Sequence, residues 1–492
     1  MSTLPVDIYS VTAVRDIDRA AIEGAGIPGY TLMTRAGAAA VSEARDHFPE
    51  AKRWQVVCGA GNNAGDGYVV ARLAAKEGIV VSVVALVDPE SLKGDAASAY
   101  RDFVADGGVV NGWSGQLDAD ADLIFDGLLG SGLERDVEGD FALAVAAMNS
   151  HTANVVALDI PTGIHGDTGM VMAFAVRADL TVTFVGLKAG LFLTDGPDYC
   201  GKVLFADLGV PPKCRQGCEA EFRRIDDDHI QRTLPPRRRA AHKGDFGHVL
   251  IVGGGPGMPG AVRLCGEAAL RAGAGLVSIA THPDHAAMIV ASRPELMSHG
   301  IASTGDLEAL IEKADVIAFG PGLGRSDWAS NAVAVLRKDE RPAVWDADAL
   351  NWLAESPEFV EQRVITPHPG EAGRLLDRPV TKIQADRRQA LTDLRGRYGG
   401  VAVLKGSGTL VSSPGAVPWL CTAGNPGMAA PGMGDVLTGI IAALLAQGLK
   451  LEDAAAVGVA AHAQAGDRAA CAGERGLMAS DLLEQLRPVI NP

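Results

Sequence analysis

Short apolar runs alternate with helical stretches along most of this 492-residue chain. In the first half, an amphipathic helical pattern over residues 10–36 precedes the alternation. Several runs are apolar on both faces, as strands of a helix-covered parallel sheet are. The expected strands are residues 55–58, 80–86, 123–125, 155–158, 180–184 and 202–205, and the expected helices are 67–77, 96–106 and 141–149. This order predicts an α/β doubly wound domain.

A second α/β series begins at residue 248. Its expected strands are residues 248–252, 275–280, 316–319, 343–345, 364–365, 401–404 and 409–411, and its helices are 260–272, 435–447 and 451–472. Between the two series, prolines bracket a charged stretch within residues 211–239, which is typical of a domain connection. The chain is also too long for one ordinary core. We therefore predict two domains, residues 1–224 and 225–492.

Charge and cysteine usage exclude several classes of protein. The formal net charge is −16 and the single dense basic run is Arg237-Arg238-Arg239, so a nucleic-acid partner is disfavoured. The 7 cysteines are an odd number and are spread along the chain, which indicates free thiols in a reducing compartment. The start resembles no signal peptide, and the apolar segment 436–445 is too short to span a bilayer. We expect a cytoplasmic protein without a membrane partner.

Two glycine-rich segments lie where a strand and a helix are expected to meet. Residues 59–67 follow an apolar run, and residues 425–435 precede the apolar run 436–445. The first amides of a helix are unpaired, and the peptide dipoles point their positive ends there, so this end of a helix attracts phosphate. Two such segments predict two sites for phosphate-bearing molecules.

Carboxylates accompany the first glycine-rich segment. Asp66 lies in that segment, while Asp126 and Asp159 follow expected strands, whose carboxyl ends line the binding crevice of a parallel sheet. Oxygens of Asn63, Asp126 and Thr162 could converge on a hard cation. In the alternative interpretation, these aspartates only cap helices or turns. The segment matches neither the dinucleotide fingerprint nor a Walker loop.

The second glycine-rich segment ends in Asp435, which suits the base of a phosphoryl transfer: amides would hold the phosphate while the carboxylate takes a proton. Asp is also a favoured helix N-cap, which is the structural alternative. Residues 405–409 follow a strand and could bind nucleotide phosphate or ribose. His368 and Glu371 lie on a proline-stiffened turn and could contact substrate or magnesium-bound water, although a lone histidine can be structural.

Residues 14–224 resemble the epimerase domain of the bifunctional NAD(P)H-hydrate repair enzymes. The matching pieces are Asp16 with Asp18, residues 32–37, 62–67, 126–132, 159–163 and 184–188. The resemblance implies a Rossmann-like fold, interconversion of the R and S forms of hydrated NADH and NADPH, and K⁺ held near Asn63, Asp126 and Thr162. Asp126 and Asp159 are the catalytic candidates, and Lys188 could assist them or be structural. Ala64 stands where the family commonly has glycine. The implied substrate contacts are Asn62, Asn63, Ala64, Gly65, Asp66, Gly130, Ser131, Gly132, Leu133, Glu134, Arg135, Asp136 and Asp159.

The second half resembles the ribokinase-like α/β domain of the same enzymes. The matching pieces are residues 243–247, 260–261, 272–277, 320–324, 346–350, 366–371, 405–409 and 434–435. The resemblance implies dehydration of the S hydrate to NAD(P)H, with Mg²⁺ and either ADP, usual in bacterial members, or ATP, usual in eukaryotic ones. The implied hydrate contacts are Ala261, Gly324, His368 and Asp435, the last as catalytic base. The implied nucleotide contacts are Lys405, Gly406, Ser407, Gly408, Thr409 and Gly434.

The anion loop departs from the family pattern at two positions. Family members usually have glycine near Pro431, and Met433 stands where serine or threonine is usual. Pro431 fixes its own φ and restricts Ala430, while Met433 removes a hydroxyl donor. Backbone amides of residues 432–434 can still hold phosphate, so we expect dehydration to be retained but slower.

Two other functions compete with metabolite repair. A small-alcohol kinase, for example of a vitamin precursor, would use the same Asp435 beside a non-catalytic N-terminal binding domain. A scaffold derived from the epimerase domain would be expected to lose its acidic residues, whereas Asp66, Asp126 and Asp159 are present. The partners we expect are hydrated NADH or NADPH and ADP or ATP, and we expect the chain to form a homo-oligomer.

Overall fold

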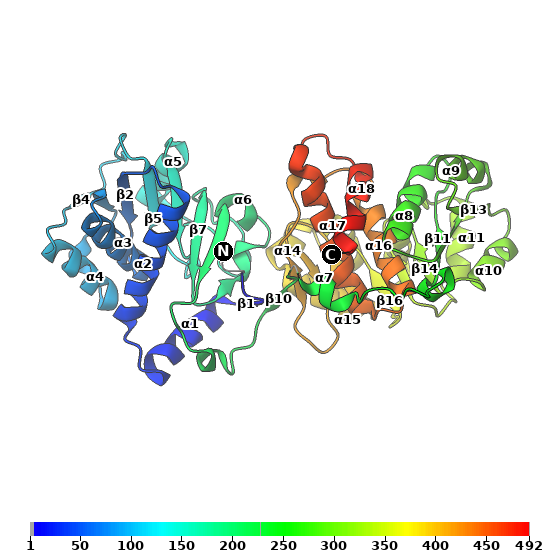
Figure 1. Ribbon diagram of the computed structural model, residues 1–492, viewed down its shortest axis with the longest axis horizontal. Helices are drawn as coiled ribbons and strands as arrows, with labels where there is room; N and C mark the ends of the chain where they lie inside the picture. The colour runs from blue at the N-terminus through cyan, green and yellow to red at the C-terminus, as the bar shows by residue number, and fades with distance from the viewer. Residues whose placement is uncertain (1–3, 227, 492) are drawn as a thin grey trace. The chain divides into compact units, whose positions relative to one another are not determined.

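The computed structural model describes residues 4–226 and 228–491, and it divides into two compact units, Met1–Arg223 and Arg224–Pro492 (Figure 1). Each unit has hydrophobic clusters of its own. Among the described residues, every helix falls short of the length and apolar character that a bilayer crossing requires.

The first unit is built on a seven-stranded parallel sheet in the order β4-β3-β2-β5-β6-β7-β9. Val56 and Val57, neighbours on β2, belong to different core clusters, so helices cover both faces of the sheet. The strands are β2 (Arg53–Cys58), β3 (Val80–Ala85), β4 (Val110–Gly112), β5 (Leu123–Gly127), β6 (Asn154–Leu158), β7 (Leu180–Phe184) and β9 (Lys202–Ala206). Outside this seven-stranded sheet, β1 (Asp7–Tyr9) pairs in parallel with β8 (Leu187–Lys188) and antiparallel with β10 (Phe222–Arg224).

The helices of the first unit are α1 (Val11–Arg19), α2 (Gly29–His47), α3 (Asn62–Lys76), α4 (Gly94–Ala105), α5 (Gly139–Ser150) and α6 (Gly196–Cys200). The helical pattern of residues 10–36 is divided in the structure, because a π-helical turn (Ala20–Gly24) and a break separate α1 from α2. The break contains Gly26 at φ +71° and Pro28, which precedes the first residue of α2. Neither residue favours the interior of a helix.

The second unit contains a mixed sheet in the order β13-β12-β11-β14-β15-β16-β17-β18-β19. Pairing is parallel from β13 to β17 and antiparallel from β17 to β19. The strands are β11 (His248–Val252), β12 (Leu276–Thr281), β13 (Met297–Gly300), β14 (Val316–Phe319), β15 (Ala343–Trp345), β16 (Arg363–Ile365), β17 (Val401–Leu404), β18 (Thr409–Val411) and β19 (Trp419–Cys421).

Helices α8, α16, α17 and α18 supply much of the core of the second unit. Helices α8 and α16 pack closely, since a Cβ at Gly439 would lie 2.1 Å from the carbonyl oxygen of Cys265. The helices are α7 (Asp228–Thr233), α8 (Pro259–Arg271), α9 (Ala286–Ser292), α10 (Thr304–Ile311), α11 (Asp327–Leu336), α12 (Asp348–Glu355), α13 (Pro369–Leu376), α14 (Val380–Ala385), α15 (Arg387–Tyr398), α16 (Met433–Ala446), α17 (Leu451–Ala469) and α18 (Ala479–Ile490).

The α/β class predicted for both halves is confirmed, and the long apolar strands fall within one or two residues of their expected bounds. The missed strands are β1, β4, β8, β10, β13 and β19, all of 2 to 4 residues. Runs this short carry little periodicity, and pairing with a neighbouring strand decides whether they form.

Candidate active sites

A cavity of about 850 Å³ lies at the carboxyl ends of the strands in the first unit. One wall is formed by α1 and the π-helical turn after it. The residues that line it recur at helical spacing: Val11, Val14, Arg15 and Asp18 on α1, and Ile22 in the turn. The start of α3, residues 128–135 and the segments after β6 and β7 form the other walls. This volume suits part of a dinucleotide.

An ion pair between Asp159 and Lys188 lies at the floor of this cavity. Asp159 follows β6 in a left-handed conformation, at φ +68°, which aims its carboxylate across to β8. Lys188 is 2% exposed. Its Nζ also donates to Thr183 Oγ1 at 3.1 Å and to the carbonyl of Phe184 at 2.9 Å. A buried lysine held by three oxygens fixes the position of the carboxylate it pairs with.

Two further carboxylates face the same cavity, and both hold protons more tightly than an exposed aspartate does. Burial raises the pKa of Asp66 well above its ordinary value, and the charges of Asp159 and Asp18 raise it further, against Lys188. Burial likewise raises the pKa of Asp18 to about 6. The cavity thus places Asp66, whose carboxyl group burial makes harder to ionise, near Asp159, whose side chain pairs with Lys188. Proton exchange at a substrate requires an acid and a base within one site.

Asp126 and Thr162 form a buried polar cluster behind the cavity wall. Asp126 lies inside β5, rather than after it as the sequence suggested, and is fully buried. Its Oδ1 accepts from Thr162 Oγ1 at 2.7 Å, and its Oδ2 accepts from the amide of Thr162 at 2.7 Å. Among the described residues, both polar atoms of the Asn63 side chain are buried and unpartnered. An unsatisfied buried amide oxygen is available to a cation.

The predicted epimerase contacts divide into two groups. Cavity-lining residues are Asn62, Asn63, Asp66, Gly130, Ser131, Gly132, Leu133, Glu134, Arg135 and Asp159. Ala64, Gly65 and Asp136 lie outside that lining in the described chain: Ala64 is buried in the core, Gly65 packs against Met33, and Asp136 is exposed.

Most of the glycine-rich segment 59–67 is helical, because α3 begins at Asn62. The turn is made by Gly61 alone, at φ +147°. Gly65 is required by packing instead, since a Cβ there would lie 2.6 Å from Met33 Cε and 2.9 Å from Ala96 Cα. Asp66 is therefore held by a helix rather than by a loop.

Asp435 lies in the first turn of α16, as the sequence predicted. The helix is preceded by Gly432 at φ +88°, where a Cβ would lie 2.6 Å from Leu264 Cδ1. Burial raises the pKa of Asp435 to about 7, the charges of Asp346 and Asp348 add to this, and Lys405 opposes it. A carboxyl group with this pKa is half ionised at neutral pH and is suited to act as a base.

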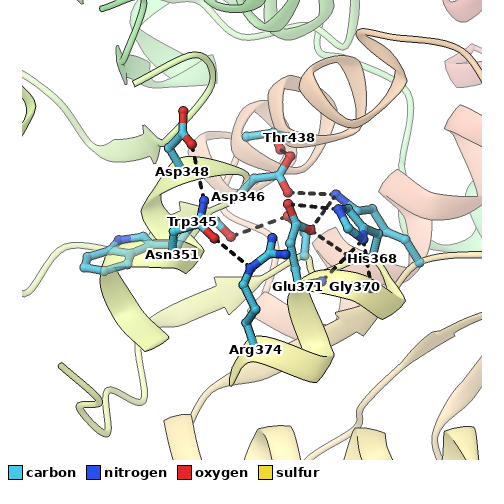
Figure 2. Close-up of polar contacts among 11 residues, drawn as sticks. Trp345, Asp346, Asp348, Asn351, His368, Gly370, Glu371, Arg374 and Thr438 are labelled. Carbon is cyan, nitrogen blue, oxygen red and sulfur yellow. Dashed lines mark hydrogen bonds and ion pairs between the residues drawn. The ribbon is translucent and has the colours of Figure 1, made fainter. Parts of the chain in front are cut away.

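Asp346 and Lys405 form a buried ion pair beside Asp435. Lys405 Nζ lies 2.8 Å from Asp346 Oδ1, and Thr438 Oγ1 donates to Asp346 Oδ2 at 2.9 Å (Figure 2). Although burial opposes it, the charge of Lys405 lowers the pKa of Asp346. A Cβ on Gly434 would lie 3.3 Å from both partners, so the start of α16 sits directly against the pair.

His368 and Glu371 cap the start of α13 and face the same pair. The amide of His368 donates to Glu371 Oε2 at 2.8 Å, while His368 Nδ1 accepts from the amide of Gly370 at 3.0 Å (Figure 2). Glu371 Oε2 lies 3.8 Å from Lys405 Nζ. Burial, then the charge of Lys405, lowers the pKa of His368, so the ring is neutral at physiological pH. The capping role does not exclude substrate contact, because half of the His368 side chain, 51%, is exposed.

The predicted hydrate contacts Ala261 and Gly324 belong to neighbouring segments. A Cβ on Gly322 would lie 3.0 Å from Ala261 Cβ, and one on Gly324 would lie 3.3 Å from Met258 Cε. The amide of Gly324 donates to Asp348 Oδ2 at 2.8 Å, and the charge of Asp348 acts on Asp435. A hydrogen bond to Asp348 thus ties Gly324 to a carboxylate whose charge acts on Asp435, and the charge of Lys405 acts on both Asp435 and His368.

The predicted nucleotide loop joins β17 to β18. Lys405 lies at its start, Ser407 is exposed, and Thr409 Oγ1 donates to the carbonyl of Gly406 at 2.9 Å. Gly406 adopts φ +134° and Gly408 φ +67°, conformations that favour glycine. The backbone path of this loop therefore depends on glycine at positions 406 and 408.

The two departures from the family pattern have different surroundings. Met433 is 6% exposed and belongs to the hydrophobic core, so its side chain packs inward from the first turn of α16. Its carbonyl lies 2.9 Å from His462 Nε2. Pro431 lies in the turn before the helix. Met433 thus places a core side chain where the family usually has a hydroxyl, so the backbone amides of residues 432–434 are left to hold an anion.

Sequence reasoning gave no role to Asp18 or Asp346. Asp346 directly follows β15, so the strand-end rule applied to Asp159 could have found it. Asp18 shares a face of α1 with Val14 and Arg15, but the sequence alone does not show that this face borders a cavity. Thr438 carried no signal, since a lone threonine inside an apolar helix is common.

Both α/β units have carboxylates at the carboxyl ends of their strands. The second unit also has an acidic residue at a helix start, beside a nucleotide-type loop. These features define a two-site enzyme that acts on phosphate-bearing small molecules. The family model for NAD(P)H-hydrate dehydratase matches residues 249–488, and that for the YjeF-related protein N-terminus matches residues 29–190. The bifunctional NAD(P)H-hydrate repair enzyme Nnr of Coxiella burnetii is 45% identical, over 99% of either chain. That of Escherichia coli is 43% identical over 100% of this chain and 95% of the relative. The chain belongs to the family of bifunctional NAD(P)H-hydrate repair enzymes.

Solved structures support the ribokinase-like fold of the second unit. The ADP/ATP-dependent NAD(P)H-hydrate dehydratase of Bacillus subtilis, co-crystallised with ATP and Mg²⁺, matches with a TM-score of 0.50 at 30% identity, over 54% of this chain and 96% of that one. A ribokinase-like superfamily protein of Enterococcus faecalis matches with a TM-score of 0.52 at 29% identity, over 55% of this chain and 96% of that one. Full-length family membership favours repair over the kinase and scaffold alternatives.

Proposed function

We propose that the chain repairs hydrated NADH and NADPH in two steps. The first unit interconverts the R and S hydrates, and the second unit dehydrates the S form at the expense of ADP or ATP. The observation that carries the proposal is the placement of Asp435 in the first turn of α16, beside the Asp346–Lys405 ion pair. Family membership supplies the substrate, and this geometry supplies the chemistry.

In the first step, the ring hydroxyl leaves the carbon next to the ring nitrogen and water returns from the other face. Departure needs a proton for the hydroxyl, and return needs a base for the water. Asp66, whose pKa burial raises, and Asp159, which Lys188 holds in place, face one cavity and suit these two tasks. Asp126 is buried away from the cavity lining among the described residues, which favours a role in holding the cation over proton transfer.

The residues predicted to hold K⁺ fit a monovalent cation. Asn63 offers an unpartnered buried oxygen, Thr162 a hydroxyl and Asp126 a single carboxylate. Within residues 4–226 and 228–491, His, Cys, Asp and Glu form no cluster of three that would hold a transition metal. A bound cation would stabilise residues at the start of α3, including Asp66, in the cavity wall.

In the second step, Asp435 takes the proton of the ring hydroxyl as that oxygen attacks the terminal phosphoryl group of the nucleotide. The bond from that phosphorus to the bridging oxygen breaks, releasing the shortened nucleotide. The lone pair of the ring nitrogen then expels inorganic phosphate, and loss of a proton from the adjacent carbon restores NAD(P)H. Amides of residues 432–434 and the Lys405 loop would hold the anions. Mg²⁺ would arrive with the nucleotide phosphates, because protein ligands alone seldom hold it.

Restored NADH absorbance tests the whole proposal. Purified protein is incubated with S-hydrated NADH and either ADP or ATP, and the expected result is nucleotide-dependent recovery of absorbance. With the R hydrate, recovery is expected to require epimerisation first, and to slow when tetramethylammonium replaces K⁺. No recovery with either nucleotide would refute dehydration, and accumulation of a stable phosphorylated alcohol would favour the kinase alternative.

The rate of dehydration is expected to rise with pH and to level off above about pH 7, since only ionised Asp435 accepts a proton and burial raises its pKa to about 7. Below the pKa, kcat/KM falls about tenfold per pH unit. The pH profile of kcat/KM for the S hydrate at saturating nucleotide measures this. A profile that is flat between about pH 5 and about pH 8 would remove Asp435 from the role of base.

Two expectations from the sequence stay predictions: location in the cytoplasm and assembly into a homo-oligomer. Light scattering of the purified protein tests the second, and a monomeric mass would refute it.

A further inference from the structure

Arg387, the first residue of α15, lies beneath the loop of residues 404–409. It is 2% exposed, although arginine is seldom buried so fully. Nη2 donates to the carbonyls of Leu404 at 3.2 Å, Lys405 at 3.3 Å and Gly408 at 3.1 Å. One guanidinium thus holds both ends of the loop from the inside.

The fit between Arg387 and the loop is close. Nη1 donates to Gln384 Oε1 at 2.8 Å, which fixes the plane of the guanidinium. A Cβ on Gly406 would lie 3.0 Å from the same Nη1, so a side chain at this position would displace the loop or the arginine. The glycine of the loop is therefore matched to the arginine below it.

The charge of Arg387 is not neutralised by an ion pair with any residue that the structure describes. Burial lowers its pKa to about 10, so the guanidinium is still charged at neutral pH. Burying an unpaired cation is costly, and carbonyl dipoles offset only part of that cost. An anion bound on the outer face of the loop would interact favourably with this charge.

The orientation of the loop peptides points to the same ligand. The C=O and N–H of one peptide point in opposite directions, so carbonyls turned toward Arg387 turn the following N–H groups away from it. The N–H of Gly406, which follows the carbonyl of Lys405, has no partner among the described residues. Lys405 itself pairs with Asp346 through Nζ, so the arginine that holds its backbone also fixes the origin of that ion pair.

We propose that Arg387 is a positioning residue that holds the 404–409 loop in its nucleotide-binding form and presents an uncompensated positive charge to the nucleotide phosphates. The proposal rests on the dehydratase function proposed above. Arg387 reaches the nucleotide only through the loop, so it acts on nucleotide affinity more than on the chemical step.

The test compares Arg387→Met and Arg387→Lys with the wild type. For Arg387→Met, we expect the KM for ADP or ATP to rise about tenfold or more, with kcat reduced less. Arg387→Lys keeps the positive charge but loses the planar guanidinium with its several N–H donors. Its KM for the nucleotide is therefore expected to lie between those of the wild type and Arg387→Met. The epimerase activity of the same chain should be unchanged in both variants.

Arg363 offers a matched control for the loss of a buried arginine. It is also 2% exposed and donates to the carbonyls of Glu358 and Tyr398, but an ion pair with Glu358 neutralises it, and the 404–409 loop is not among its partners. Arg363→Met is expected to lower the melting temperature without raising the nucleotide KM.

An unchanged nucleotide KM in folded Arg387→Met, or an equal rise in Arg363→Met, would overturn the proposal. If Arg387→Met does not fold, Arg387→Lys decides in the same way. A wild-type protein without nucleotide-dependent repair would refute the proposed function instead. In that case, calorimetric ADP binding still tests Arg387, because weaker binding by the variant supports the positioning role and equal binding removes it.

Discussion

Replacing Asp435 by Asn is expected to lower kcat for nucleotide-dependent dehydration by about 10³-fold, the scale of a lost general base. Asn keeps the size and hydrogen-bonding capacity of the side chain at the start of α16 but cannot take the hydroxyl proton. Because burial and Asp346 already disfavour the ionised form, the melting temperature at about pH 8 should be equal or higher. Steady-state rates with S-hydrated NADH, together with a thermal melt, measure both effects.

Asp327→Asn is the matched control for this substitution. Asp327 is also an aspartate in the first turn of a helix, α11, but it is exposed. Asp327→Asn removes a favourable interaction between a carboxylate and the dipole of a helix, as Asp435→Asn does, but it leaves the dehydratase site unchanged. Dehydration at wild-type speed in Asp435→Asn would mean that Asp435 only complements the dipole at the start of α16, whose N-cap is Gly432. Epimerisation should be unaffected in either variant.

Replacing Asp159 by Asn is expected to reduce the enzymatic rate of epimerisation by about 10³-fold. The substitution removes a carboxylate from the cavity and leaves buried Lys188 without its ion-pair partner. Asn tolerates the left-handed backbone of this position, φ +68°, so the chain path should be kept. The rate at which a pure R hydrate becomes available to the dehydratase, after subtraction of the uncatalysed rate, gives the measurement.

The chain offers a control for the backbone conformation as well. Asp377, which is exposed at the end of α13, also adopts a left-handed conformation, at φ +54°. Asp377→Asn should preserve the melting temperature and epimerisation. If Asp159→Asn retained full epimerase activity, proton transfer would have to be assigned to Asp66 or Asp18 instead.

The two units make these experiments informative, because each activity is an internal control for the other. Asp435 and Arg387 belong to one unit and Asp159 to the other. A variant that loses one activity and keeps the second has been purified intact, with the unit of the retained activity folded, and a thermal melt reports on the substituted unit. A variant that loses both has lost more than a catalytic group.

The glycine-rich segments show how far residue type alone carries an interpretation. Glycine adopts left-handed conformations more readily than other residues, and Gly61, Gly406 and Gly432 do have positive φ. Gly65, by contrast, lies within α3 and is required because α2 and α4 approach it closely. Steric demand from a distant segment leaves no local pattern, so the sequence could not separate these two uses of glycine.

The sequence by itself determined the α/β class, the longer apolar strands of each sheet, and the position of Asp435 at a helix start, because hydrophobic periodicity and helix-terminal residue types are local properties. Only the tertiary structure decided which polar groups meet. Asp18 reaches the cavity of Asp66 and Asp159 because α1 forms part of the cavity wall. Arg387 bonds to the 404–409 loop because α15 packs beneath β17, although Leu404, the nearest of these residues in the sequence, is 17 positions away. Burial and the neighbouring charges then set the proton affinities of Asp66 and Asp435, and both depend on contacts between segments far apart in the chain.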